Sequence, residues 1–161
     1  MIDDLLDCPV PPDGLAPVVH GPVVLGRAPG IAVGLRCIFG YPQGLSLPMV
    51  LRARGVQAEA ACRLTFPAPG RSLPEAGEPE LGPLLTVEVD GAGQVLRPSS
   101  EESSGGGDAF DLEAAYWVAG LPSDGRLRLT VAWPRAGLPE TGVLLTLPDL
   151  HDLDARVLSL P

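Results

Sequence analysis

The chain has 161 residues and a formal net charge of −9, with 45% hydrophobic and 19% charged residues. A chain of this length is expected to fold as one domain, residues 1–161, that buries roughly two thirds of the surface its unfolded form exposes. The negative charge argues against a nucleic-acid-binding protein, because phosphate neutralisation supplies most of that affinity. The sequence contains no lysine, which excludes a Schiff-base or phosphate-gripping lysine.

The first residues predict neither a signal peptide nor a membrane segment. Asp3, Asp4 and Asp7 lie where a secretory signal carries positive charge. No apolar run approaches the roughly 18 residues that a transmembrane helix needs. We therefore expect a cytoplasmic protein with no membrane partner, and we treat residues 1–14 as a candidate disordered segment.

Alternation of apolar and polar residues with a period of two is the strongest structural signal in the chain. A first strand is expected within residues 16–26. Residues 31–39, 45–54 and 56–66 then alternate in turn, which predicts an antiparallel meander of three strands. Pro48 cannot donate to a β-ladder, so the strand of residues 45–54 is expected to lie at a sheet edge or to carry a bulge.

The second half of the chain is expected to alternate strands with loops and to end in a helix. Residues 67–83 and 98–109 are rich in proline, glycine or serine, which predicts long loops. The dipeptide Asp90-Gly91 predicts a hairpin turn. Residues 149–160 have helical spacing of leucines behind a capping Asp149, which predicts a short terminal helix. The expected strands are residues 84–89, 94–98, 110–118, 126–133 and 143–147.

These elements predict an all-β fold, because strands and turns follow one another without a βαβ rhythm. We expect an antiparallel β-sandwich of immunoglobulin-like or Greek-key type, with about eight strands and a short C-terminal helix. A closed β-barrel would show the same periodicity and remains the alternative.

One long stretch of the sequence resembles a known group of proteins. The segments "FGYPQGLSLPMVLRAR", "SSGGGD" and "YWVAGLPSDGRLRLTVAWPRAGLPET" occur in this order. They resemble a set of small uncharacterised proteins of high-GC Gram-positive bacteria that share a tyrosine-proline turn, a glycine run and a W..LP..G.L......WP..G..ET segment. The resemblance covers roughly residues 31–147, and it implies no activity, cofactor or catalytic residue.

The two tryptophans have different expected environments. Trp133 shares the parity of the apolar residues in 127–131, so we expect it in the core. Trp117 lies on the face that carries Asp111 and Glu113. Either that face is covered and Trp117 is buried, which the gain from burying a tryptophan favours, or Trp117 is exposed and marks a binding surface.

Five arginines at outward positions of the expected strands provide a second candidate surface. If those strands lie in one sheet, the arginines form a basic stripe that fits an acidic partner segment or an anionic ligand. The alternative is a solvated face on which Arg52 pairs with Glu59, which the alternation itself favours. Together with Trp117, the candidate ligand- or partner-binding residues are Arg36, Arg52, Arg63, Arg126 and Arg128.

Signals for catalysis or metal binding are weak. Cys37 and Cys62 are both expected to face inward as free thiols, roughly 10 Å apart and therefore beyond disulfide reach. His20 lies in an apolar strand and His151 on a charged surface helix, so neither predicts a metal ligand. The glycine run 105–107 lacks the lysine and the helix of a phosphate-binding loop. We expect no cofactor and no metal.

The sequence thus favours a non-catalytic protein that acts through protein contacts, as a homo-oligomer or as an accessory subunit. A protein that binds a small ligand, for instance an anion, is the alternative. A hydrolase is less favoured, because it needs a histidine in a cleft within hydrogen-bond distance of a nucleophile.

Overall fold

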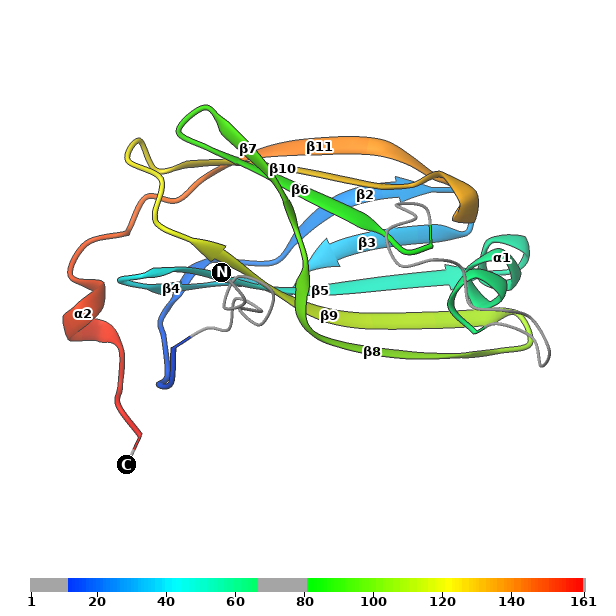
Figure 1. The fold of residues 1–161 in the computed structure, drawn as a ribbon, viewed down its shortest axis with the longest axis horizontal. Helices are drawn as coiled ribbons and strands as arrows, with labels where there is room; N and C mark the ends of the chain where they lie inside the picture. Colours follow the sequence, from blue (N-terminus) through cyan, green and yellow to red (C-terminus); the bar gives the residue numbers. More distant parts are fainter. Residues whose placement is uncertain (1–11, 67–80, 161) are drawn as a thin grey trace, which may run out of the picture.

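The computed structural model describes residues 12–66 and 81–160 and shows two antiparallel sheets packed face to face (Figure 1). This confirms the all-β sandwich. In the described part of the chain the two sheets remain separate and do not close into a barrel. The expectations for residues 1–11 and for residues 67–80 lie outside the described residues.

Within the described residues the larger sheet has seven strands, with β5 at its centre. Along one side β5 pairs with β9, which in turn pairs with β8. Along the other side β5 pairs with β3 and β4, beyond which lie β2 and β1. The strands are β1 (Val18–His20), β2 (Val23–Ala28), β3 (Ile31–Leu35), β4 (Ile38–Tyr41), β5 (Gly44–Arg54), β8 (Pro98–Gly106) and β9 (Ala109–Ala119).

The smaller sheet, as far as the chain is described, has four strands in the order β11-β10-β6-β7. The predicted hairpin at Asp90-Gly91 is confirmed, and it joins β6 to β7 with φ angles of 51° and 80° at the turn, as a two-residue hairpin turn requires. After β7 the chain crosses directly into β8 of the larger sheet (Figure 1). The strands are β6 (Leu84–Val89), β7 (Ala92–Leu96), β10 (Arg126–Trp133) and β11 (Leu138–Thr146), with a short 3-10 helix η2 (Pro134–Ala136) before β11.

The core lies between the sheets and is filled by the predicted inward positions of β5, β9 and β10. Trp133 is fully buried, as predicted, and its ring packs edge-on against Phe110 at a centroid distance of 5.9 Å. Each fully buried apolar side chain stabilises the fold by about 1.5–3 kcal/mol. The fully buried leucines of these strands are Leu45, Leu47, Leu51, Leu127 and Leu129.

Residues 56–66 do not form the third strand of a meander. Val56–Thr65 is the helix α1, and its buried residues are Ala58 and Ala61, at the spacing of one helical turn. Alanine, glutamine, glutamate and arginine favour helix over strand, and they dominate this segment. Gly55, with φ of 66°, turns the chain from β5 into the helix, a conformation that side-chain-bearing residues rarely adopt.

Residues 98–106, predicted as part of a long loop, form strand β8. Its main chain pairs with β9 from Pro98 to Gly106, so the ladder of the hairpin orders a segment that has few apolar side chains. A Cβ atom on Gly105 would lie 2.7 Å from the Sγ atom of Cys62. The missing side chain therefore lets α1 pack closely against the end of the β8–β9 hairpin.

The prediction of an edge position for Pro48 is also wrong, because β5 is central. The Pro48 carbonyl accepts a 3.0 Å hydrogen bond from the Arg36 N–H, at the interruption between β3 and β4. Since the nitrogen and carbonyl of one residue face the same neighbour in an antiparallel ladder, the missing donor faces this interruption. The interruption also shifts the parity, so Ile38 is fully buried while Cys37 and Phe39 are only half-buried.

The ends of the domain differ in detail from the sequence expectations. The single strand expected within residues 16–26 is replaced by two short strands, β1 and β2, the second of which runs on to Ala28. The C-terminal helix α2 (Leu153–Arg156) is shorter than predicted and buries Leu153. No helix within residues 12–66 and 81–160 is long and apolar enough to cross a membrane.

Candidate functional site

Trp117 is buried, with 7% of its surface exposed. Its ring meets the ring of Tyr41 edge-on at a centroid distance of 5.7 Å, and Gly44 lies beneath it, where a Cβ atom would approach the indole to 2.8 Å. The Tyr41 hydroxyl donates a 3.4 Å hydrogen bond to the Gly14 carbonyl. The covered alternative is therefore the one that the structure shows, and Trp117 offers little surface to a partner.

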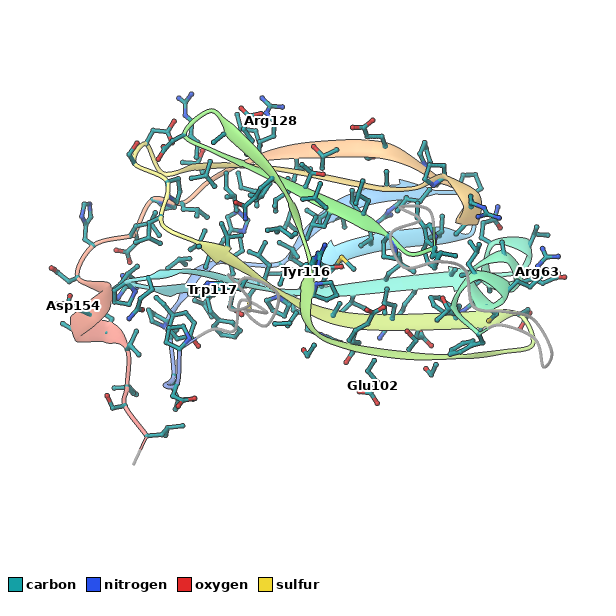
Figure 2. All side chains as sticks on the ribbon, in the orientation of Figure 1. Arg63, Glu102, Tyr116, Trp117, Arg128 and Asp154 are labelled. Atoms are coloured by element: carbon teal, nitrogen blue, oxygen red, sulfur yellow. The ribbon has the colours of Figure 1, made fainter. Side chains whose placement is uncertain are left out.

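The candidate arginines do not form one stripe. Arg36 and Arg52 lie on the larger sheet, Arg63 lies on α1, and Arg126 and Arg128 lie on β10 in the smaller sheet. Figure 2 shows Arg128 on the opposite side of the molecule from β8, and Arg63 at the far end beside α1. The condition for a basic stripe, that all these strands share one sheet, is not met.

The arginines of the larger sheet pair with carboxylates of β9. Arg36 donates from Nη2 to Oε1 of Glu113 over 2.6 Å, and the Nε atom of Arg52 lies 3.3 Å from Oδ1 of Asp111. The predicted pairing of Arg52 with Glu59 is wrong, because Glu59 lies one helical turn from Arg63 on α1. These side chains are about half exposed, so each pair contributes at most about 1 kcal/mol and exchanges partners readily.

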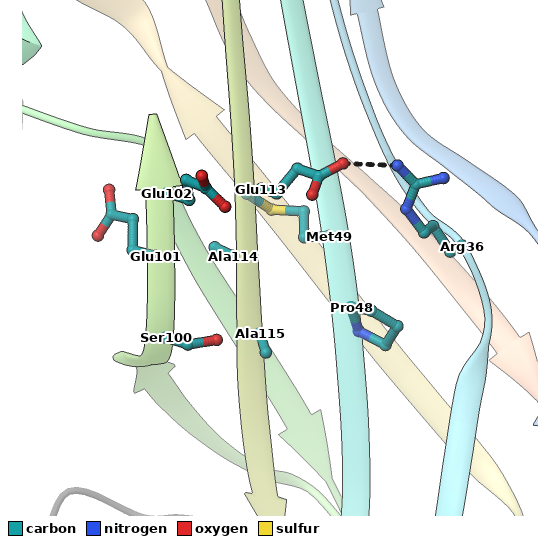
Figure 3. Close-up of a pocket in the computed structure, with 9 residues that line it drawn as sticks. All are labelled: Arg36, Pro48, Met49, Ser100, Glu101, Glu102, Glu113, Ala114 and Ala115. Atoms are coloured by element: carbon teal, nitrogen blue, oxygen red, sulfur yellow. Dashed lines mark hydrogen bonds and ion pairs between the residues drawn. The ribbon is translucent and has the colours of Figure 1, made fainter. Parts of the chain in front are cut away.

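The outer face of the larger sheet, which points away from the core, is hollowed on both sides of Arg36. The first hollow, here the acidic hollow, has a volume of about 480 Å³. Its floor includes Pro48 and Ala115, and Glu102 and Glu113 flank it, as Figure 3 shows. The second, here the apolar hollow, has about 440 Å³ and lies over Val24, Gly34, Val50 and Arg52.

The acidic hollow contains an unbalanced pair of charges. Glu102 on β8 lies directly opposite Glu113 on β9 in the register of the hairpin, and like charges at such positions repel. Arg36 contacts Glu113, whereas Glu102 forms no such ion pair with another of the described residues. A cation placed between the two carboxylates would relieve this repulsion. In the described ranges no group of three or more metal-binding side chains has a geometry that holds a metal ion.

Two groups, the Tyr116 hydroxyl and the Cys37 thiol, have a raised pKa, which favours their neutral forms. Burial and the nearby Glu101 raise the pKa of Tyr116, which is 3% exposed, and burial raises the pKa of the Cys37 thiol. A raised thiol pKa makes Cys37 a poor nucleophile at neutral pH. Cys37 and Cys62 are both free cysteines.

The two histidines have different environments. His20 is half-buried in β1, and its Nδ1 atom donates a 2.7 Å hydrogen bond to the Gly21 carbonyl. His151 is exposed, and its main-chain carbonyl accepts a 3.2 Å hydrogen bond from Arg156. Among the described residues, the hydrogen-bond partner of the His20 ring is thus a main-chain carbonyl. The hydrolase hypothesis needs the hydroxyl or thiol of a nucleophile at hydrogen-bond distance from a histidine.

Sequence reasoning missed Glu102, Glu113 and Ala115 as site residues. Glu102 fell in the predicted loop, so nothing placed it opposite Glu113. The sequence does contain a signal for this pairing, because Gly107-Asp108 is the two-residue turn that joins β8 to β9. Reading that turn as a hairpin would have placed the two glutamates side by side.

Comparisons with family models, with curated proteins and with solved structures found no match to this chain.

Proposed function

We propose that this chain is a non-catalytic interaction module that binds a protein partner through the outer face of its larger sheet. In this proposal the acidic hollow receives a basic side chain of the partner. The observation that carries the proposal is the hollow of about 480 Å³ between Glu102 and Glu113, with Pro48 and Ala115 in its floor.

The chemistry of the hollow suits a long basic side chain. The small apolar floor accommodates the aliphatic stem of an arginine or lysine, which commonly lies along apolar surface. The two carboxylates then accept charge-assisted hydrogen bonds from its head group. The exposed Arg36–Glu113 pair, with side chains 57% and 55% exposed, is weak enough to exchange for the partner's cation.

The outer face of the smaller sheet lacks this imbalance. There Arg128 lies directly opposite Glu88 in the register of β10 and β6, and Thr130 lies opposite Thr86. Matched charges and paired threonines are typical of a solvated face. The difference between the two faces favours the larger sheet as the binding surface.

A protein that binds a small anion is the second candidate. Arg36 and Arg52 both line the apolar hollow, and guanidinium groups bind carboxylates and phosphates in two-pronged contacts. Both arginines already pair with carboxylates, which weakens their attraction for an anion. We place the module in the cytoplasm, a reducing compartment that agrees with the free thiols of Cys37 and Cys62.

The proposal is tested by selecting random linear peptides on the immobilised protein at low surface density. The enriched peptides are expected to contain an arginine or lysine, and Glu102→Lys is expected to weaken their binding at least about tenfold, or 1.4 kcal/mol. Glu88→Lys on the smaller sheet is the matched control and should leave binding unchanged. Selected peptides without basic residues, or peptides that bind the Glu102→Lys variant equally well, would refute the proposal.

A further inference from the structure

We infer that the partner of this face is a second copy of the chain, in a two-fold dimer whose larger sheets pack outer face against outer face. In this dimer Arg36 of each copy enters the acidic hollow of the other. The inference rests on the proposed function, because it names the partner that the hollow receives.

The outer face is divided into an acidic half and a basic half. Carboxylates lie on β8 and β9, and arginines lie on β5, on β2 and at the end of β3. The paired registers place the strands in rows across the face. One row reads Arg27, Ala32, Arg52, Asp111, Ser104, and the next reads Val24, Gly34, Val50, Glu113, Glu102.

This division makes the face complementary to itself. A two-fold axis that runs parallel to the strands, between β5 and β9, exchanges β5 with β9 and β3 with β8. Arg52 then faces Asp111 of the second copy, and Arg36 faces the part of β8 that contains Glu102. Each contact occurs twice because a two-fold interface is isologous. Opposite charges meet at both positions, as complementary interfaces require.

The shape of the face also suits such an arrangement. Gly34, Ala32 and Ala115 are small, and they leave room for the side chains of a second sheet, which packs about 10 Å away in an aligned sandwich. Arg36 stands between the two hollows and lines both of them. In the dimer it is the protruding group that fills the hollow of the other copy.

An edge-to-edge dimer through β8 is less favourable. Glu102 is the middle residue of this nine-residue strand, so symmetric antiparallel pairing of two β8 strands would place Glu102 opposite its own copy. Like charges directly opposite one another destabilise a ladder, and charged edge residues commonly prevent such pairing. The acidic residues of β8 therefore disfavour edge pairing, whereas in the face-to-face dimer Glu102 contacts Arg36 of the second copy.

The size of the face predicts a weak dimer. Five strands spaced by about 4.8 Å span roughly 24 Å. Along the strands, the contact rows extend over about six residues, or roughly 20 Å. The buried area is then roughly 1,000 Å² in total, at the lower end for specific interfaces. We expect a dissociation constant in the micromolar range.

Charge reversal tests the reciprocal contact. Sedimentation velocity from about 5 to about 500 µM should show a reversible dimer for the wild type, a range that brackets micromolar dissociation. Arg36→Glu and Glu102→Arg should each be monomeric, because each places like charges at both contacts. An equimolar mixture of the two variants, and the double variant, should dimerise again. Arg128→Glu on the smaller sheet is the matched control and should dimerise as the wild type does.

The outcomes separate this inference from the proposed function. A wild type that stays monomeric at every concentration overturns the dimer, while the peptide selection still tests the hollow. A dimer that neither reversal weakens, or a mixture that fails to dimerise although both variants keep a native circular dichroism spectrum, also overturns it. Loss in each variant with recovery in the mixture supports it.

Discussion

Replacing Trp117 by alanine distinguishes a structural tryptophan from a binding tryptophan. The side chain is 7% exposed and packs against Tyr41 and Gly44. A structural role predicts a large loss of stability from Trp117→Ala, whereas a surface role predicts almost none.

The expected magnitude follows from the buried area. A tryptophan buries about 150–250 Å², which at about 25 cal/mol per Å² corresponds to roughly 4–6 kcal/mol as an upper estimate. The edge-on contact with Tyr41 contributes a further 0.5–1.5 kcal/mol at about the usual strength of aromatic pairs. Because Trp117 lies on the outer side of the sheet, water can enter the space it leaves, so we expect a net loss of about 3 kcal/mol, at the low end for tryptophan-to-alanine changes.

Urea unfolding followed by far-ultraviolet circular dichroism measures this loss. Trp117→Phe keeps an aromatic ring beside Tyr41 and should lose about half as much. Trp133→Ala, in the middle of the core, provides the upper reference at about 4–5 kcal/mol. A loss below about 1 kcal/mol for Trp117→Ala, in the range of surface substitutions, would show that the ring is not packed against Tyr41 and Gly44.

Three further predictions test the fold at single positions, the first of them with a control variant. Gly44→Ala would press a methyl group against the Val118 carbonyl and the Trp117 indole, and thermal unfolding should show a loss of at least about 2 kcal/mol. Gly106→Ala, with open space around it, is the control and should be neutral within about 0.5 kcal/mol. Because the pKa of Tyr116 is raised above its ordinary value of 10.0, the folded state keeps this proton longer than the unfolded state does. The free energy of unfolding should therefore fall above about pH 10, by up to about 1.4 kcal/mol per pH unit, and Tyr116→Phe should remove this slope in urea titrations. Ala61→Asp places a charge at a fully buried position of α1 and should lower stability by more than about 2 kcal/mol, whereas a strand over residues 56–66 would have left this position on the surface and the change without effect.

The strands with an apolar face were predictable, because one side of each is removed from water. In β5, β9 and β10 the alternation of side chains matches the alternation of burial almost residue by residue. Even the proline at position 48 is accommodated inside a central strand, since its missing donor faces the interruption between β3 and β4. Periodicity thus reports burial reliably but does not report which strands are neighbours.

The two wrong elements have different physical reasons. In α1 the alternation over residues 56–62 also fits a helix, and the adjacent alanines at 60 and 61, with few β-branched neighbours, favour the helix on propensity. In β8 the serines and glycines contribute little burial, so no periodicity is visible. β8 forms because β9 offers it hydrogen-bonding partners along its whole length. The sequence of β8 alone does not show that such a partner is present.

The candidate site depends on the pairing of β8 with β9. Glu102 and Glu113 are eleven residues apart in sequence, and only the register of the β8–β9 hairpin brings them opposite one another. If the register slipped by one residue, Glu101 would replace Glu102 opposite Glu113, but its side chain would have to move from the inner to the outer side of β8. Because β9 holds its parity through the buried Phe110, Leu112 and Ala114, the core of the sandwich determines which glutamate faces outward. The acidic character of the outer face is therefore a consequence of core packing on the inner face, and substitutions that disturb this packing should change binding without touching the hollow.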